Sequence, residues 1–178
     1  MYDCVADIDE SKFVGNCVLC IDWGKLNDFT VITAVHVDTK EAIIVDRFNQ
    51  IGYDVQGSRI LKAIRRLNPT GIYAESNAMG EAMIDFLRGA GATIRDVRMD
   101  YNTKKTMVED LQYAIEKREI TLQNNDTLIN ELLAYDIERT KAGRVTYNAP
   151  SGMHDDCVMS LAIAWHGCDG GGKRWWIS

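Results

Sequence analysis

Long apolar runs and prolines are scarce in this sequence, and each scarcity excludes a class of protein. No segment approaches the ~20 consecutive apolar residues that a helix needs to cross a bilayer. The N-terminal stretch MYDCVADIDE lacks the basic flank and the apolar core of a signal peptide. Two prolines in 178 residues, with 46% hydrophobic and 26% charged residues, are typical of a folded globular protein. We therefore expect one globular domain, with no membrane partner, that works inside a cell.

Cysteine is also limited, and its odd count of five does not indicate a disulfide framework. Several cysteines lie within apolar runs, so we expect reduced and mostly buried thiols at Cys4, Cys17, Cys20, Cys157 and Cys168. Cys17 and Cys20 form a C-x-x-C, but the pair lies inside an expected strand and no second pair accompanies it. Zinc binding and redox chemistry are therefore not favoured.

A net positive charge is absent as well. The formal charge of −6 excludes a generally basic coat protein for nucleic acid, because phosphate binding normally depends on Lys and Arg. It does not exclude a nuclease, since bound cations and a locally basic groove can coexist with an acidic remainder. The sequence also has no GxxxxGKS or GxxxxGKT loop and offers no Ser-His-Asp set. P-loop ATP hydrolysis and covalent acyl chemistry are therefore unsupported.

Hydrophobic periodicity divides the chain into strands and helices. Residues 1–15 show no clear periodicity and resemble a connector, and three strands that favour an antiparallel meander follow at 16–22, 29–37 and 42–48. Helices over 54–67 and about 79–87 alternate with strands at 72–75 and 93–97, and such crossovers imply parallel pairing. Further helices are expected over 103–117, 128–133 and 155–166, with a β-hairpin at 136–147.

Acidic residues stand at three points where an apolar segment meets a turn. Asp22 ends a strand in CIDWGKLNDFT, Glu75 ends another in GIYAES, and Asp155 and Asp156 open a helix in HDDCVMSLAIAW. Separated carboxylates are costly to bring together unless cations neutralise them, and hard Mg²⁺ or Mn²⁺ prefers oxygen ligands. These acids together predict one divalent-metal site of the kind that cuts or joins phosphodiesters.

Plainer interpretations of the same acids stay open. Asp22 is also compatible with an acid that merely begins a turn, where Gly24 lets the backbone bend. Asp155 and Asp156 are compatible with helix acids that complement the dipole. Adjacent helical residues point ~100° apart, so only one of the two is expected to face the site fully. Glu75 is harder to explain in this way, because the residues before it suit burial.

The element order and four motifs carry a resemblance to a known family. The motifs are DWGKLNDFT at 22–30, YAES at 73–76, the helix start at Lys104 and Lys105, and HDDCVMSLAIA at 154–164. Over residues 16–167 the chain resembles the ribonuclease H-like fold, and more narrowly the C-terminal nuclease domain of the large terminase subunit of tailed bacteriophages. This resemblance implies an α/β fold, with a mixed central sheet of five or more strands, flanking helices and an added β-hairpin.

The resemblance also implies roles for single residues. Asp156 is favoured as the ligand that faces the site, and Asp155 then lies behind it or serves as an alternate ligand. Asp28 is expected as an auxiliary ligand or as a residue that orients water, with a turn acid as the alternative. His154 is expected either to bind metal or phosphate or to be an ordinary loop histidine. The implied chemistry is two-metal phosphodiester hydrolysis, with Asp22 bridging two Mg²⁺ or Mn²⁺ ions.

Basic residues are the candidate contacts for DNA. Lys104 and Lys105 begin a helix, and a helix N-terminus with lysine beside it suits a phosphate, although surface solubility explains them equally well. In the expected hairpin, Arg139, Lys141 and Arg144 are placed to grip the DNA backbone, which provides affinity without sequence choice.

By resemblance, the chain is expected to cut double-stranded concatemeric viral DNA during genome packaging, in the cytoplasm of the infected bacterium. Its implied partners are the terminase ATPase domain, the small terminase subunit and the portal protein. Residues 1–15 are then a linker remnant, 16–168 the nuclease domain and 169–178 a flexible tail, without the ATPase motor.

Several alternatives share these features. A Holliday-junction resolvase, a transposase core and a ribonuclease H use the same carboxylate logic. An actin-like ATPase has a related fold, but it needs a second phosphate loop and a glycine-rich adenosine pocket, and neither is found. A catalytically idle DNA-binding or docking module is the remaining alternative, and it predicts that metal has no effect.

Overall fold

The computed structural model of the chain describes residues 2–24, 28–76, 78–139, 145–148, 150 and 154–168. Its centre is a seven-stranded sheet with the strand order β1-β7-β4-β3-β2-β5-β6. The strand bounds are β1 Val5–Ala6, β2 Cys17–Asp22, β3 Thr30–His36, β4 Glu41–Phe48, β5 Gly71–Glu75, β6 Arg95–Val97 and β7 Thr121–Gln123.

The sheet is mixed, as its register shows. β2, β3 and β4 pair antiparallel, which confirms the predicted meander. β5 pairs parallel with β2, and β6 parallel with β5, as the two helical crossovers required. Every residue of β2 is buried, because helices cover both faces of the sheet at this strand.

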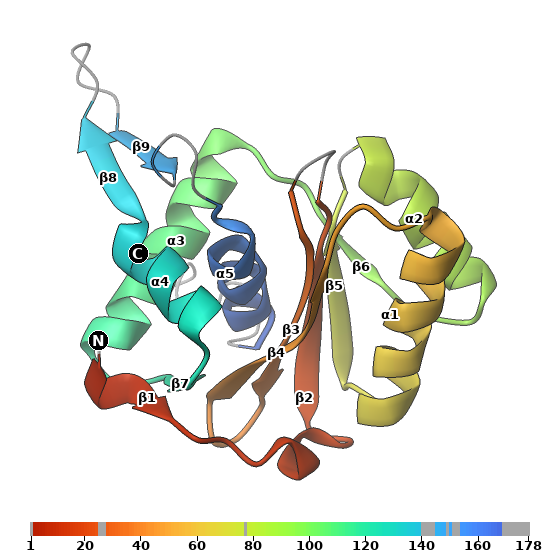
Figure 1. The fold of residues 1–178 in the computed structure, drawn as a ribbon, viewed down its shortest axis with the longest axis horizontal. Helices are drawn as coiled ribbons and strands as arrows, with labels where there is room; N and C mark the ends of the chain where they lie inside the picture. The colour runs from red at the N-terminus through yellow and green to blue at the C-terminus, as the bar shows by residue number, and fades with distance from the viewer. Residues whose placement is uncertain are drawn as a thin grey trace, which may run out of the picture.

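Helices lie on both sides of this sheet (Figure 1). α1 (Tyr53–Leu67) and α2 (Ala78–Gly89) cover one face, where Ile60, Leu67, Ile84 and Leu87 form a core with residues of β2. α3 (Tyr101–Glu116), α4 (Asp126–Ala134) and α5 (Asp156–Cys168) lie on the other side. Because the sheet separates two cores, the side chains of β2 alternate between them.

Local capping explains where several helices begin and end. The side chain of Asp100 accepts a hydrogen bond from the N–H of Thr103 at the start of α3, and Asn125 caps α4 in the same way. α1 ends at Asn68, whose left-handed backbone (φ 45°) allows its N–H to reach the carbonyl of Ile64. Each of these bonds joins residues close together in the chain, so the bounds of these helices are set locally.

The predicted fold class is confirmed, and the added hairpin is present as β8 (Asp136–Arg139) paired with β9 (Val145–Asn148). β1 and β7 were not predicted, because strands of two and three residues show too little periodicity. β1 lies within residues 1–15 and joins the sheet through β7, and Phe13 nearby is fully buried. The linker assignment of this segment stays a prediction.

Two further findings concern the cysteines and the helix lengths. Cys4, Cys17, Cys20 and Cys157 are buried and Cys168 is half-buried, which confirms the predicted burial of the thiols. Within the described part of the chain, no helix combines the length and the apolar character needed to cross a membrane.

Candidate metal centre

The strand order brings two of the predicted ligands side by side. β2 and β5 are parallel neighbours, and Ile21 lies opposite Ala74 in their register. Asp22 and Glu75 follow one residue later, each as the last residue of its strand. Ile21 and Ala74 pack into the core beneath α1 and α2, so alternation directs Asp22 and Glu75 to the opposite face. Both carboxylates therefore lie at one edge of the sheet, on the side of α5.

The loop after β2 folds back tightly at Gly24. A Cβ at this position would collide with the carbonyl oxygen of Asp28 and lie 2.5 Å from the carbonyl carbon of Phe29. The N–H of Gly24 donates to Oγ1 of Thr30 at 3.1 Å, which ties the loop to the start of β3. Glycine is required here for close approach of two backbone segments, and this approach carries Asp28 back toward the sheet edge.

The electrostatics of Asp22 show that the carboxylates converge. Its side chain is 9% exposed, and its pKa is raised well above the usual value, first by burial and then by the charges of Glu75 and Asp156. The Asp155 carboxylate contributes in the same direction. The negative charges of Glu75, Asp155 and Asp156 therefore act on Asp22 at this edge, and a bound cation stabilises such an arrangement.

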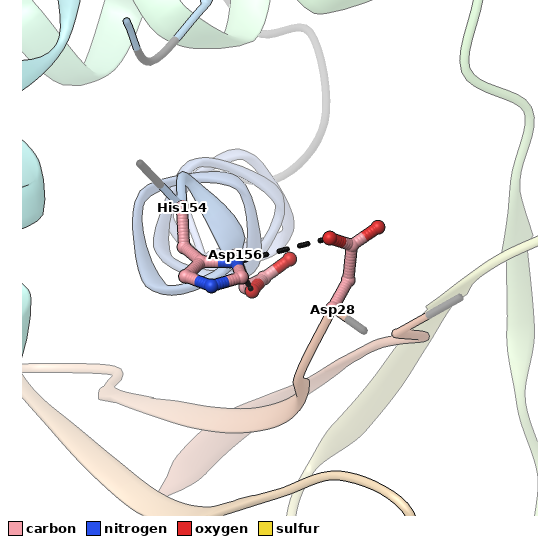
Figure 2. A group of neighbouring side chains, drawn as sticks. All are labelled: Asp28, His154 and Asp156. Atoms are coloured by element: carbon pink, nitrogen blue, oxygen red, sulfur yellow. Dashed lines mark ion pairs between the residues drawn. The ribbon is translucent and has the colours of Figure 1, made fainter. Parts of the chain in front are cut away.

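Asp156 forms a second group with Asp28 and His154 (Figure 2). Nδ1 of His154 lies 3.5 Å from Oδ2 of Asp156 and 3.7 Å from Oδ1 of Asp28. One ligand atom from each of the three residues lies within 4.8 Å of the others. Burial raises the pKa of Asp156 to about 6, although the N–H of Phe29, which donates to Oδ2 at 3.0 Å, lowers it.

Asp155 takes a different direction from its neighbour. Its carboxylate lies 3.4 Å from Nζ of Lys104 on α3, and it is 29% exposed where Asp156 is 12% exposed. Asp156 thus faces the interior of the site and Asp155 faces its rim. The two neighbouring side chains at the start of α5 therefore point in different directions. Which of the two is the primary ligand stays a prediction.

The other predicted DNA contacts are more scattered. Lys105 lies on the same helix as Lys104, but its Nζ is 4.0 Å from Oε1 of Glu109, one turn along α3. Arg139 is the last residue of β8. Lys141 and Arg144 lie outside the described residues. The structure therefore brings Lys104 next to the carboxylates, and the role of the hairpin residues stays a prediction.

The donor set fits a hard divalent cation. Carboxylate oxygens dominate it, with one imidazole at its edge, and burial together with the neighbouring negative charges raises the pKa of Asp22. Mg²⁺ and Mn²⁺ accept such oxygen-rich sites, whereas a structural zinc site is normally built from cysteine and histidine. The residues present are therefore compatible with the metals that the sequence predicted.

The residues that support this centre were not predicted from the sequence. Arg47 on β4 lies 3.4 Å from Glu131 on α4, and Glu131 accepts a hydrogen bond from the N–H of Cys157 at 2.7 Å. Glu131 lies inside the mostly apolar expected helix at 128–133, and this position was the one sequence feature that indicated a buried charge. A separate cavity of about 340 Å³ lies beside α2, which covers the opposite face of the sheet, and Arg98 and Ser76 line it with residues of that helix.

Comparison with known proteins supports this geometry. Residues 19–166 match the family model of the terminase RNaseH-like domain. The chain belongs to this family. The predicted resemblance to terminase nucleases is confirmed, and the match favours a terminase over a resolvase or a transposase.

Individual relatives of the terminase domain agree with the family match. The large terminase subunit of Thermus virus P23-45 is 26% identical over 156 residues, which are 86% of this chain and 32% of that protein. The chain thus spans about a third of the length of this curated relative.

Solved structures show the same fold. The large terminase nuclease from thermophilic phage G20c with bound magnesium has a TM-score of 0.77 and 25% identity, covering 86% of this chain and 83% of that one. The g2p nuclease domain of bacteriophage SPP1 with bound Mn has a TM-score of 0.66 at 12% identity, with 92% and 94% covered. The second likeness shows the fold alone.

Proposed function

We propose that this terminase domain is a divalent-metal-dependent endonuclease that cuts double-stranded concatemeric viral DNA during genome packaging. The observation that carries the proposal is the convergence of Asp22, Glu75 and Asp156 at the carboxyl edge of the sheet, where Asp22 is buried and repelled by the other two. Membership of the terminase family supports DNA as the substrate.

The residues that would hold metal are Asp22, Glu75 and Asp156, with Asp155, Asp28 and His154 as auxiliary ligands. Related nucleases have bound magnesium or manganese, so Mg²⁺ or Mn²⁺ is the proposed cofactor. Two such ions, when bound, supply an activated water and offset the negative charge that develops on the phosphate.

The protein's own contribution is to hold the acids in place. Asp22 and Glu75 end paired strands in the interior of the sheet, and this rigid support keeps the two proposed ligands in fixed register. The N–H of Phe29 orients the carboxylate of Asp156. Nδ1 of His154 lies 3.5 Å from Oδ2 of Asp156 and 3.7 Å from Oδ1 of Asp28, so its ring is placed beside both carboxylates.

DNA contacts are proposed on the rim of this centre. Lys104 lies beside Asp155 and is placed to meet a phosphate that approaches the carboxylates. Lys105, Arg139, Lys141 and Arg144 are proposed to contact the DNA backbone farther from the cut. Such contacts provide affinity without sequence preference.

This terminase domain is proposed to work with other packaging components. Since the chain spans about a third of a curated relative, an ATPase domain, a small terminase subunit and a portal protein are its proposed partners. Residues 16–168 are the proposed nuclease domain, with 1–15 as linker and 169–178 as a tail. The proposed location is the cytoplasm of the infected bacterium.

Digestion of supercoiled plasmid tests this function. The domain is incubated with Mg²⁺, Mn²⁺ or EDTA beside Asp22→Ala and Asp156→Ala, with folding checked by circular dichroism. Asp54→Asn is the matched control, because Asp54 is an exposed acid on α1, on the opposite face of the sheet. Metal-dependent cutting that both alanine variants lose and the control keeps is expected. If no metal supports cutting and calorimetry detects no metal binding, the docking-module hypothesis replaces the nuclease.

A further inference from the structure

A partly buried ion pair lies behind the metal centre, and none of the predicted ligands belongs to it. Nη2 of Arg47 on β4 is 3.4 Å from Oε1 of Glu131 on α4, with side chains 23% and 8% exposed. Nε of Arg47 is buried with no hydrogen-bond partner in the described part of the chain. Burying two charges costs desolvation energy that such a pair often fails to recover, so stability alone is a weak reason for this pair.

Glu131 acts as a cap for α5 from outside the helix. The first four N–H groups of a helix have no partner within it, and α5 begins at Asp156. Oε2 of Glu131 accepts the N–H of Cys157 at 2.7 Å. The carboxylate of Asp155, the residue before the helix, lies 3.4 Å from Nζ of Lys104 instead. Glu131 therefore holds the backbone immediately after Asp156.

Arg47 links this cap to the other support of Asp156. Its guanidinium carbon lies 3.3 Å from the centroid of the Phe29 ring. Phe29 donates its N–H to Oδ2 of Asp156, and its ring contacts the ring of His154 edge-on at 5.3 Å. Arg47 thus contacts both residues that orient Asp156. Glu131 holds the start of the helix that carries Asp156, and Phe29 donates its backbone N–H to the Asp156 carboxylate.

We propose that Arg47 and Glu131 are positioning residues of the metal centre, which hold the start of α5 so that Asp156 faces Asp22 and Asp28. They touch neither metal nor DNA, and they act through Cys157 and Phe29. The inference rests on the proposed function only in that these carboxylates bind a divalent cation. Outer-shell partners of this kind commonly change metal affinity about 10–100-fold when they are removed.

Two double variants separate positioning from simple structural support. Arg47→Met with Glu131→Leu removes both charges and the cap, and an apolar replacement of a buried pair is often neutral for stability. Arg47→Met with Glu131→Gln also removes both charges, but the glutamine oxygen can still accept the N–H of Cys157. Arg59→Met is the matched control, since Arg59 pairs with Asp46 and lies over Phe48.

The readouts are Mn²⁺ binding by titration calorimetry and thermal melting of the whole chain. The leucine variant is expected to melt near wild type and to bind Mn²⁺ about 10-fold or more weakly. The control is expected to stay within about threefold of wild type. The glutamine variant keeps the cap but lacks the contact of Arg47 with Phe29, so its Mn²⁺ affinity is expected to lie between those of the leucine variant and wild type. A leucine variant that folds and binds Mn²⁺ as wild type does overturns the positioning role.

A third variant covers the case in which the leucine variant does not fold. Arg47→Lys keeps a positive charge beside Glu131, but an ammonium cannot lie flat on the Phe29 ring as a guanidinium does. Weaker Mn²⁺ binding at an unchanged melting temperature supports the role, and unchanged binding overturns it. If wild type itself binds no Mn²⁺, that result contradicts the proposed function, and the positioning role is then rejected as well.

Discussion

The backbone N–H of Phe29 donates a 3.0 Å hydrogen bond to Oδ2 of Asp156, and this bond joins residues 127 positions apart. It ties the loop after β2 to the first residue of α5. One carboxylate oxygen of Asp156 is thereby held in place. The bond also favours the charged form of this carboxyl, so it opposes the effect of burial on the pKa of Asp156.

The pH dependence of stability follows from Asp156. Its pKa is about 6 in the folded protein, against an ordinary value of 3.8. This shift corresponds to about 3 kcal/mol in the free energy of unfolding. Between these two values the folded state binds more protons than the unfolded state, so the metal-free protein loses stability as pH rises from about 4 to 6. Urea unfolding in EDTA at pH 4.5 and 7.0 measures this loss. In Asp156→Asn the loss is expected to shrink; an unchanged loss would contradict the assignment.

Replacing Asp22 is predicted to stabilise the metal-free protein and to abolish its stabilisation by metal. Its carboxylate is buried among acids, so Asp22→Asn removes a repelled charge and is expected to raise the melting temperature in EDTA by a few degrees. Adding Mn²⁺ is expected to raise the melting temperature of wild type but not of this variant. Differential scanning fluorimetry at pH 7.5 measures both. A variant that Mn²⁺ stabilises as strongly as wild type would show that Asp22 is not a ligand.

Gly24 is predicted to tolerate no side chain. A Cβ there meets backbone atoms of Asp28 and Phe29, which cannot rotate away, so Gly24→Ala is expected to cost about 1–3 kcal/mol and to weaken Mn²⁺ binding. Gly89→Ala is the matched control, because a Cβ at Gly89 meets no atom within 4 Å. Urea unfolding and calorimetry compare the two. Equal effects of both substitutions would count against the close approach at Gly24.

Arg98 is predicted to contact DNA from the α2 side of the sheet, where it lines a cavity with Ser76. It follows Val97, which lies opposite Glu75 in the register of β5 and β6, and no ion pair holds it among the described residues. Arg98→Ala is expected to weaken DNA binding. It is also expected to reduce the slope of log affinity against log salt concentration by about 1, as the loss of one phosphate contact would. Arg95→Ala, at the other end of β6, is the control. Fluorescence anisotropy at several salt concentrations measures both, and equal losses would argue against a local contact.

Much of the fold was predictable from local patterns. Hydrophobic periodicity located β2 to β6 and the helices, and crossover connections implied that β2 and β5 run parallel. The placement of two strand-end acids, Asp22 and Glu75, at one edge of the sheet therefore follows from the sequence. The two shortest strands were not predictable, since β1 and β7 exist only because each pairs with a neighbour.

What the sequence by itself determined is therefore the set of elements and the acids at their ends, because both depend on residues close together in the chain. Tertiary structure alone decided that Asp156 faces inward and Asp155 meets Lys104, since this depends on how α5 is rotated. It also decided the pairing of Arg47 with Glu131, 84 residues apart. Side-chain direction at such a distance is set by the packing of whole elements, which no local pattern contains.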